Sequence, residues 1–106
     1  YVVEAANGPT SAAGDVVLER RSIPVIPDIF ANCGGVIVSY FEWVQNIQEL
    51  TWEREQVNEM LEKLMTKSFG EIVEIKKECD CTYRMAAYVL ALRKLVYAEE
   101  IKGIFP

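Results

Sequence analysis

Two asparagine-containing loops and one serine are the residues of this chain whose types and spacing could do chemistry. Asn7 opens the segment Asn-Gly-Pro-Thr, and Asn32 precedes Cys33 and the glycine pair Gly34 and Gly35. A carboxamide donates and accepts hydrogen bonds, so it suits recognition of another carboxamide, such as that of nicotinamide. Glycines at a helix start allow close approach and present backbone N–H groups to a ligand.

A simpler interpretation exists for each of these features. The Asn7 segment has every signal of a turn followed by a helix cap, and that interpretation is favoured. Asn32 could cap a helix while the glycines serve packing, and the sequence leaves both interpretations open. Ser39, within the apolar run GGVIVSYFEW, could donate back to the carbonyl one turn earlier, which spacing alone favours.

Other catalytic chemistry has little support in the residue types. The chain has no histidine, which removes the commonest general base and the usual Ser–His and Cys–His pairs. The cysteines Cys33, Cys79 and Cys81 form an odd set, expected to be free thiols in a reducing cytosol. Cys79 and Cys81 flank Asp80, an incomplete ligand set, so the sequence predicts a polar loop there and no metal site.

Composition and charge restrict the partners. The 106 residues, 51% hydrophobic and 25% charged, indicate one globular domain or part of one. A mean hydropathy of +0.08 suggests surface that a missing partner would bury. The net charge of −5 argues against nucleic acid, and the apolar runs are too short to cross a bilayer. With no signal peptide at Tyr1, the expected location is cytoplasmic.

The elements that must position the asparagines begin with a strand, a helix and a strand. Residues 1–6 read as a buried strand, Thr10 as the N-cap of a short helix, and residues 23–28 as a second strand. Tight connections predict a βαβ unit with parallel strands and a right-handed crossover. Both asparagine loops then follow the carboxyl ends of strands, where parallel sheets bind ligands.

Three long helices are predicted after Gly35. The first ends near Glu49, Thr51 caps the second, and the third runs from about Thr82 to Lys102 with Gly103 as its C-cap. Their expected inward faces are Val36, Tyr40, Trp43, Val44 and Ile47; Val57, Met60, Leu61, Leu64, Met65, Phe69, Ile72 and Ile75; and Ala86, Val89, Leu90, Tyr97 and Ile101. The fold class is therefore α/β, a partial Rossmann-like parallel sheet followed by three long C-terminal helices.

Three stretches, VVEAANGPT, IPDIFANCGGVIVSYFEWVQN and RMAAYVLALRK, resemble in order the C-terminal part of glutamate dehydrogenase of the hexameric bacterial and archaeal type. The resemblance covers essentially the whole chain. It implies reversible oxidative deamination of L-glutamate to 2-oxoglutarate and ammonia with NAD or NADP, in a homohexamer. It also implies that residues 1–49 complete a dinucleotide-binding domain and that residues 50–106 are its C-terminal helical segment.

The resemblance assigns roles to four residues. It implies that Asn7 and Asn32 lie beside the nicotinamide end of the cofactor and the reacting carbon of the substrate. It places the Ser39 hydroxyl on the side-chain carboxylate of glutamate and Val36 in the lining of the same pocket. Cys33 departs from the alanine usual in the family, without touching these positions.

No catalytic residue is expected in this segment. The chain lacks the G-x-G-x-x-G motif, and the family's catalytic lysine and aspartate belong to an N-terminal lobe that these residues do not include. The segment alone is therefore expected to be inactive, with the rest of its own polypeptide as partner. Two alternatives are a related branched-chain or aromatic amino-acid dehydrogenase, whose pocket should lack the serine, and a non-catalytic helical interaction module. The reading frame upstream of Tyr1 would separate enzyme from module.

Overall fold

The N-terminal βαβ unit is present in the computed structural model, which describes residues 1–103. Strand β1 (Val2–Val3), helix α1 (Ala12–Arg20) and strand β2 (Val25–Ile26) follow one another in the predicted order. The strands pair in parallel, Val2 opposite Val25 and Val3 opposite Ile26, which confirms the predicted orientation. Each strand has only two residues and is shorter than the predicted runs.

Helix α1 begins one residue later than predicted. Its N-cap is Ser11 rather than Thr10, because the Ser11 hydroxyl accepts a hydrogen bond from the Gly14 N–H at 3.2 Å. Both residues carry the hydroxyl that a cap requires, so the sequence signal was correct in kind and wrong by one position.

A short helix that the sequence did not predict follows β2. Helix α2 (Asp28–Ala31) begins directly after Pro27, and helix α3 (Cys33–Gln48) follows it with only Asn32 between them. Helix α3 therefore starts ahead of Gly35. It ends where predicted, because Glu49 adopts the left-handed conformation at its C-cap.

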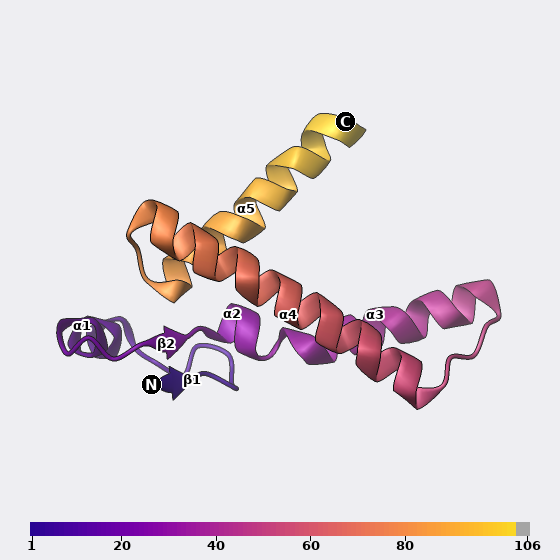
Figure 1. The fold of residues 1–106 in the computed structure, drawn as a ribbon, viewed down its shortest axis with the longest axis horizontal. Helices are drawn as coiled ribbons and strands as arrows, with labels where there is room; N and C mark the ends of the chain where they lie inside the picture. Colours follow the sequence, from indigo (N-terminus) through magenta and orange to yellow (C-terminus); the bar gives the residue numbers. More distant parts are fainter. Residues whose placement is uncertain (104–106) are drawn as a thin grey trace.

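The remaining helices are the longest. Helix α4 (Arg54–Cys79) is capped by Glu53 rather than by the predicted Thr51, and the Glu53 N–H donates to the Gln56 side chain at 2.8 Å. Helix α5 (Tyr83–Lys102) has Gly103 as its C-cap, as predicted, and it begins one residue after Thr82, the predicted start, which is its N-cap. Figure 1 shows α4 lying across α3 at one end, while α5 leads away from the other end of α4.

The buried core is small and lies between α4 and α5. Ile72 and Ile75 of α4 pack against Ala86 and Ala87 of α5, and Phe30 of α2 packs against this group. The two alanines let the helices approach closely, since helix separation depends on the side chains at the contact. The core thus joins the C-terminal helices to the helix that follows the sheet.

Several predicted inward faces are exposed. Most of the α3 stripe is uncovered, with Val36 74%, Tyr40 58%, Trp43 57% and Ile47 61% exposed. The assignment of Tyr97 and Ile101 in α5 to an inward face is also wrong, since they are 66% and 64% exposed. No element within residues 1–103 covers these side chains.

The overall dimensions agree with this incomplete burial. The principal extents are 51 × 36 × 23 Å and the radius of gyration is 16.4 Å, whereas a compact domain of this length has about 13 Å. Across the helices described here, none combines the length and apolar character that crossing a membrane requires.

Candidate functional site

The fold brings Asn7 and Asn32 together. Asn7 follows β1 in a turn that Gly8 makes with a positive φ of 58°, and Asn32 lies between α2 and α3. The side-chain Nδ2 of Asn32 donates a hydrogen bond to Oδ1 of Asn7 at 2.5 Å. Two loops that the sequence placed separately at the carboxyl ends of the strands therefore form one amide pair.

The direction of this hydrogen bond determines what the pair can still recognise. It uses a donor of Asn32 and an acceptor of Asn7, and among residues 1–103 no partner within the chain engages Nδ2 of Asn7 or Oδ1 of Asn32. The NH2 group of Asn7 and the carbonyl oxygen of Asn32 remain, and together they are the complement of a primary carboxamide. The pair therefore fits a carboxamide ligand.

The alternative interpretations of Asn32 and the glycines have little support in the structure. Asn32 occupies the cap position of α3 but makes no side-chain cap hydrogen bond. A Cβ on Gly34 would meet Leu61 at 3.8 Å, an ordinary contact, and a Cβ on Gly35 would meet nothing within 4 Å. Packing inside the described part of the chain does not require glycine at either position.

Val36 and Ser39 lie on the same face of α3 as Asn32. They follow Asn32 by four and seven residues, which places the three side chains along one helix face over roughly 10 Å. Val36 and Ser39 are both exposed. The structure thus aligns all four predicted site residues from the amide pair along α3 but does not bring Ser39 into contact with the pair.

The hydroxyl of Ser39 is not used inside the helix. No hydrogen bond from Ser39 to the carbonyl one turn earlier occurs within the described residues, although Gln45 of the same helix makes such a bond to the Phe41 carbonyl at 3.3 Å. The back-bonding interpretation that spacing favoured is therefore not supported. The hydroxyl is exposed and able to donate to a ligand.

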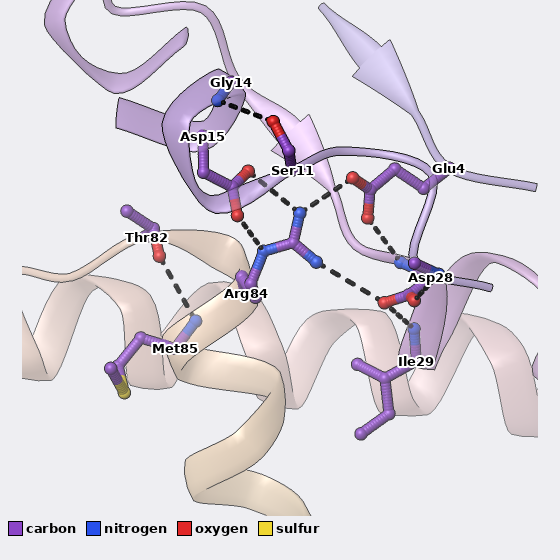
Figure 2. Close-up of polar contacts among 10 residues, drawn as sticks. Glu4, Ser11, Gly14, Asp15, Asp28, Ile29, Thr82, Arg84 and Met85 are labelled. Carbon is purple, nitrogen blue, oxygen red and sulfur yellow. Dashed lines mark hydrogen bonds and ion pairs between the residues drawn. The ribbon is translucent and has the colours of Figure 1, made fainter. Parts of the chain in front are cut away.

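A charged cluster that sequence reasoning missed lies next to the amide pair. The guanidinium of Arg84, in the first turn of α5, meets the carboxylates of Glu4 (2.7 Å), Asp15 (3.0 Å) and Asp28 (3.4 Å), as Figure 2 shows. We call these four residues the Arg84 cluster. The one sequence signal for it was Glu4 itself, a carboxylate in a strand predicted to be buried.

Glu4 is the most buried member of the Arg84 cluster, with its side chain 1% exposed. The hydrogen bond from Arg84 is the main reason that its pKa falls to about 2, assisted by Thr10 and by the Asp28 N–H, while burial opposes the shift. The same contact raises the pKa of Arg84. Both groups are therefore charged at neutral pH.

The cysteines take no part in this site. All three thiols are free, as predicted, and Cys33 packs its sulfur against that of Met65 at 3.4 Å. Burial raises the pKa of the Cys33 thiol, which disfavours the nucleophilic thiolate. Within residues 1–103, no group of three His, Cys, Asp or Glu side chains is placed to hold a metal ion.

A cavity of about 570 Å³ lies on another side of the Arg84 cluster. Its lining comes from α1, the segment leading into β2, and the turn between α4 and α5, and it includes Arg84 but neither asparagine. Lys76, a second cation in the lining, lies over the ring of Tyr83 at 5.4 Å. The cavity is therefore separate from the amide pair.

Comparison with known proteins gives one consistent result. A family model described as glutamate/leucine/phenylalanine/valine dehydrogenase matches residues 1–103. The glutamate dehydrogenase of Thermotoga maritima is 49% identical over 105 residues, which cover 99% of this chain and 25% of that protein. The cryptic catabolic NAD-specific glutamate dehydrogenase of Bacillus subtilis is 49% identical over 102 residues, 96% of this chain and 24% of that protein.

Solved structures agree with the sequence comparison. The glutamate dehydrogenase of Peptoniphilus asaccharolyticus has a TM-score of 0.89 at 40% identity, covering 98% of this chain and 27% of that one. The hetero-hexameric glutamate dehydrogenase of Thermus thermophilus, in its Leu-bound form, also has a TM-score of 0.89. It is 29% identical, and the match covers 97% of this chain and 25% of that one. The chain thus spans about a quarter of the length of these relatives.

Proposed function

Because the chain belongs to the glutamate/leucine/phenylalanine/valine dehydrogenase family, we propose that it forms part of an NAD- or NADP-dependent glutamate dehydrogenase. The complete enzyme would convert L-glutamate reversibly to 2-oxoglutarate and ammonia. The observation that carries the proposal is the amide pair of Asn7 and Asn32, which joins the turn after β1 to the residue between α2 and α3 in a chain of this family. Its relatives with high identity over the whole chain are glutamate dehydrogenases.

Asn7 and Asn32 would hold the nicotinamide end of the coenzyme. The donor and acceptor left over by their mutual hydrogen bond match the carboxamide of nicotinamide, and the open space beside Gly35 leaves room for close approach. When bound, the coenzyme supplies the ring that exchanges a hydride with the α-carbon of the substrate. The role of the two asparagines is to orient that end of the coenzyme.

Ser39 would bind the side-chain carboxylate of glutamate, with Val36 lining the same pocket. A hydroxyl that donates to a carboxylate is a specificity device, because a substrate without the carboxylate leaves the polar groups of the site unpaired. The exposed hydroxyl of Ser39, on the same face of α3 as Asn32, supports this role.

The proton transfers require residues outside this segment. We assign them to a lysine and an aspartate in the remainder of the polypeptide, three quarters of the length of the relatives, which would also close over the site and exclude water. One relative is described as hetero-hexameric. For this protein we propose a homohexamer.

A second candidate is a dehydrogenase for leucine, phenylalanine or valine, since the matching family model includes these activities. The two candidates differ in what the side-chain pocket must accept. An apolar substrate gives no partner to a serine hydroxyl, so Ser39 favours the acidic substrate.

Replacing Ser39 with alanine in the complete enzyme tests the proposal. Loss of a hydrogen bond to a charged group should lower kcat/KM for glutamate by about 10- to 100-fold. The value for norvaline, which lacks the side-chain carboxylate, should change by less than about threefold. Ser68→Ala in α4 is the matched control and should alter neither value. Equal losses for glutamate and norvaline would remove Ser39 from the assigned role.

A further inference from the structure

Asp28 connects the two backbone segments that carry the amide pair. Its Oδ2 accepts a hydrogen bond from the N–H of Gly8, the neighbour of Asn7, at 2.7 Å. Its Oδ1 accepts from the Ile29 N–H at 2.8 Å, and its backbone carbonyl accepts from the Asn32 N–H at 3.2 Å. One residue thus fixes the Asn7 turn and both ends of α2, the helix that leads to Asn32.

Asp28 is in turn held by Glu4 and Arg84. Glu4 accepts the Asp28 N–H at 3.0 Å through one carboxylate oxygen and meets Arg84 at 2.7 Å through the other. Arg84 also meets Oδ1 of Asp28 directly at 3.4 Å. Figure 2 shows the carboxylates of Glu4 and Asp28 both meeting the guanidinium. The buried carboxylate of Glu4 therefore holds Asp28 only while Arg84 compensates its charge.

The shape of the guanidinium is essential to this arrangement. Arg84 uses Nε, Nη1 and Nη2 to meet carboxylates from three different elements, namely the end of β1, α1 and α2. A lysine ammonium is a single point charge on a flexible stem and cannot reproduce the planar fork. One arginine at the start of α5 thereby positions segments that lie 56 to 80 residues earlier in the chain.

We propose that Arg84 is a positioning residue for the nicotinamide end of the coenzyme. Acting through Asp28 and Glu4, it fixes the backbone on both sides of the amide pair, so that the donor of Asn7 and the acceptor of Asn32 face the carboxamide together. Among the described residues, Arg84 makes no hydrogen bond to either asparagine. The inference depends on the proposed function of the amide pair.

The test compares three variants in the complete polypeptide: Arg84→Met, Arg84→Lys and the control Arg93→Met. Arg93 lies on the same helix and pairs with Glu78 on the surface, with side chains 53% and 61% exposed. Two quantities are measured at a temperature at which circular dichroism shows every variant folded. They are amide hydrogen exchange of peptides that cover residues 5–11 and 28–33, and the Kd for reduced coenzyme by fluorescence.

Arg84→Met should accelerate exchange in both peptides and raise the Kd by about tenfold or more, because the amide pair loses its fixed geometry. Arg84→Lys should give an intermediate result, and Arg93→Met should change neither quantity. A residue with a merely structural role would lower the melting temperature but leave the Kd of the folded protein unchanged. An unchanged Kd in Arg84→Met would therefore overturn the inference.

Should Arg84→Met fail to fold, Asp28→Asn decides the question. This change keeps the size of the side chain and an acceptor for Ile29, but it turns an amide group toward the Gly8 N–H and so removes that hydrogen bond. Faster exchange in residues 5–11 with a raised Kd supports the inference, and an unchanged Kd overturns it. If the unchanged protein binds no reduced coenzyme, the proposed function itself fails, and the coenzyme role of Arg84 fails with it.

Discussion

The Arg84 cluster and the exposed face of α3 differ in whether their side chains find partners within the described chain. In the Arg84 cluster, every carboxylate has the guanidinium as its partner inside the chain, and Glu4 is almost fully buried. On α3, Val36, Tyr40 and Trp43 are mostly exposed, and no element within residues 1–103 covers them. The charged groups of the Arg84 cluster are thus paired with one another, whereas the apolar side chains of α3 have no covering partner among the described residues.

This difference separates the residues that would support the proposed site from those that would contact its ligand. The Arg84 cluster reaches the Asn7 turn through the hydrogen bond from the Gly8 N–H to Asp28, while Val36 and Ser39 are exposed on α3. A rigid scaffold that presents an open, partly apolar face is the usual arrangement for a ligand site that a second domain covers. Three changes test whether the two regions differ in this way.

The largest effect is expected from Arg84→Ala. Removing the only cation from a cluster of three carboxylates leaves buried Glu4 uncompensated, which should lower the free energy of unfolding by about 3–5 kcal/mol. Arg93→Ala, at an exposed pair on the same helix, should leave the urea midpoint unchanged within error. If the two substitutions shifted the urea midpoint equally, the Arg84 cluster would contribute no more to stability than the exposed pair of Arg93 and Glu78.

The pH dependence of stability should show the next effect. Because the pKa of Glu4 is lowered from 4.5 to about 2 in the folded protein, the unfolded chain binds the proton more tightly. Glu4 thus stabilises the fold fully above pH 4.5, and this contribution is lost as the pH falls toward 2.

Urea midpoints measured at pH 6 and pH 3 check this expectation. The unchanged protein should lose more stability between the two values than Glu4→Gln, which has no carboxyl at this position to protonate. Glu78→Gln, on the surface, should behave like the unchanged protein. If Glu4→Gln lost as much stability between pH 6 and pH 3 as the unchanged protein, groups other than Glu4 would be responsible for the loss.

The smallest effect concerns the exposed face of α3. Gly35→Ala should stabilise the fold by about 0.5–1 kcal/mol, because alanine favours a helix and its Cβ would meet nothing within 4 Å. It should nevertheless weaken coenzyme binding, because the added methyl group would occupy open space beside the proposed coenzyme site. Gly70→Ala, in a similarly open position of α4, should stabilise equally and leave binding unchanged. If the two variants bound the coenzyme with equal affinity, the proposal that the exposed face of α3 contacts the coenzyme would be wrong.

Local signals in the sequence predicted the elements but not all of their boundaries. The parallel strands, the end of α3 and the C-cap of α5 were correct, since turn and cap residues act over a few positions. Thr51 was wrong as the cap of α4 because the Trp52 N–H bonds to the Gln45 side chain at 2.6 Å. That contact ties the segment before Glu53 to α3 and delays the start of α4.

Periodicity identified apolar faces without showing what covers them. Ile72 and Ile75 are buried as predicted, yet Tyr97 and Ile101 are exposed because no described element reaches their end of α5. A helical stripe records that a side chain is suited to burial, and the partner is set by tertiary structure. Periodicity likewise predicted burial for Val36, Tyr40, Trp43 and Ile47 of α3, and all four are exposed.

The site also contains features that the sequence could predict and features that it could not. Asn7 and Asn32 could be placed at one sheet edge from topology, although their mutual hydrogen bond could not be predicted. The Arg84 cluster was beyond sequence reasoning, because its contacts join residues 56 to 80 positions apart and follow no local pattern. The roles of Ser39 and Val36 came from family resemblance, and they remain predictions.

The long sequence separation between Glu4 and Arg84 has a consequence for biosynthesis. A ribosome makes the Asn7 turn and must then add α1 to α4 before Arg84 exists. Until then Glu4 has no guanidinium partner, so the turn cannot reach its final position. The Asn7–Asn32 pair, the proposed carboxamide-binding end of the site, should therefore reach its final position only after α5 has been made, and a product truncated before α5 would lack it.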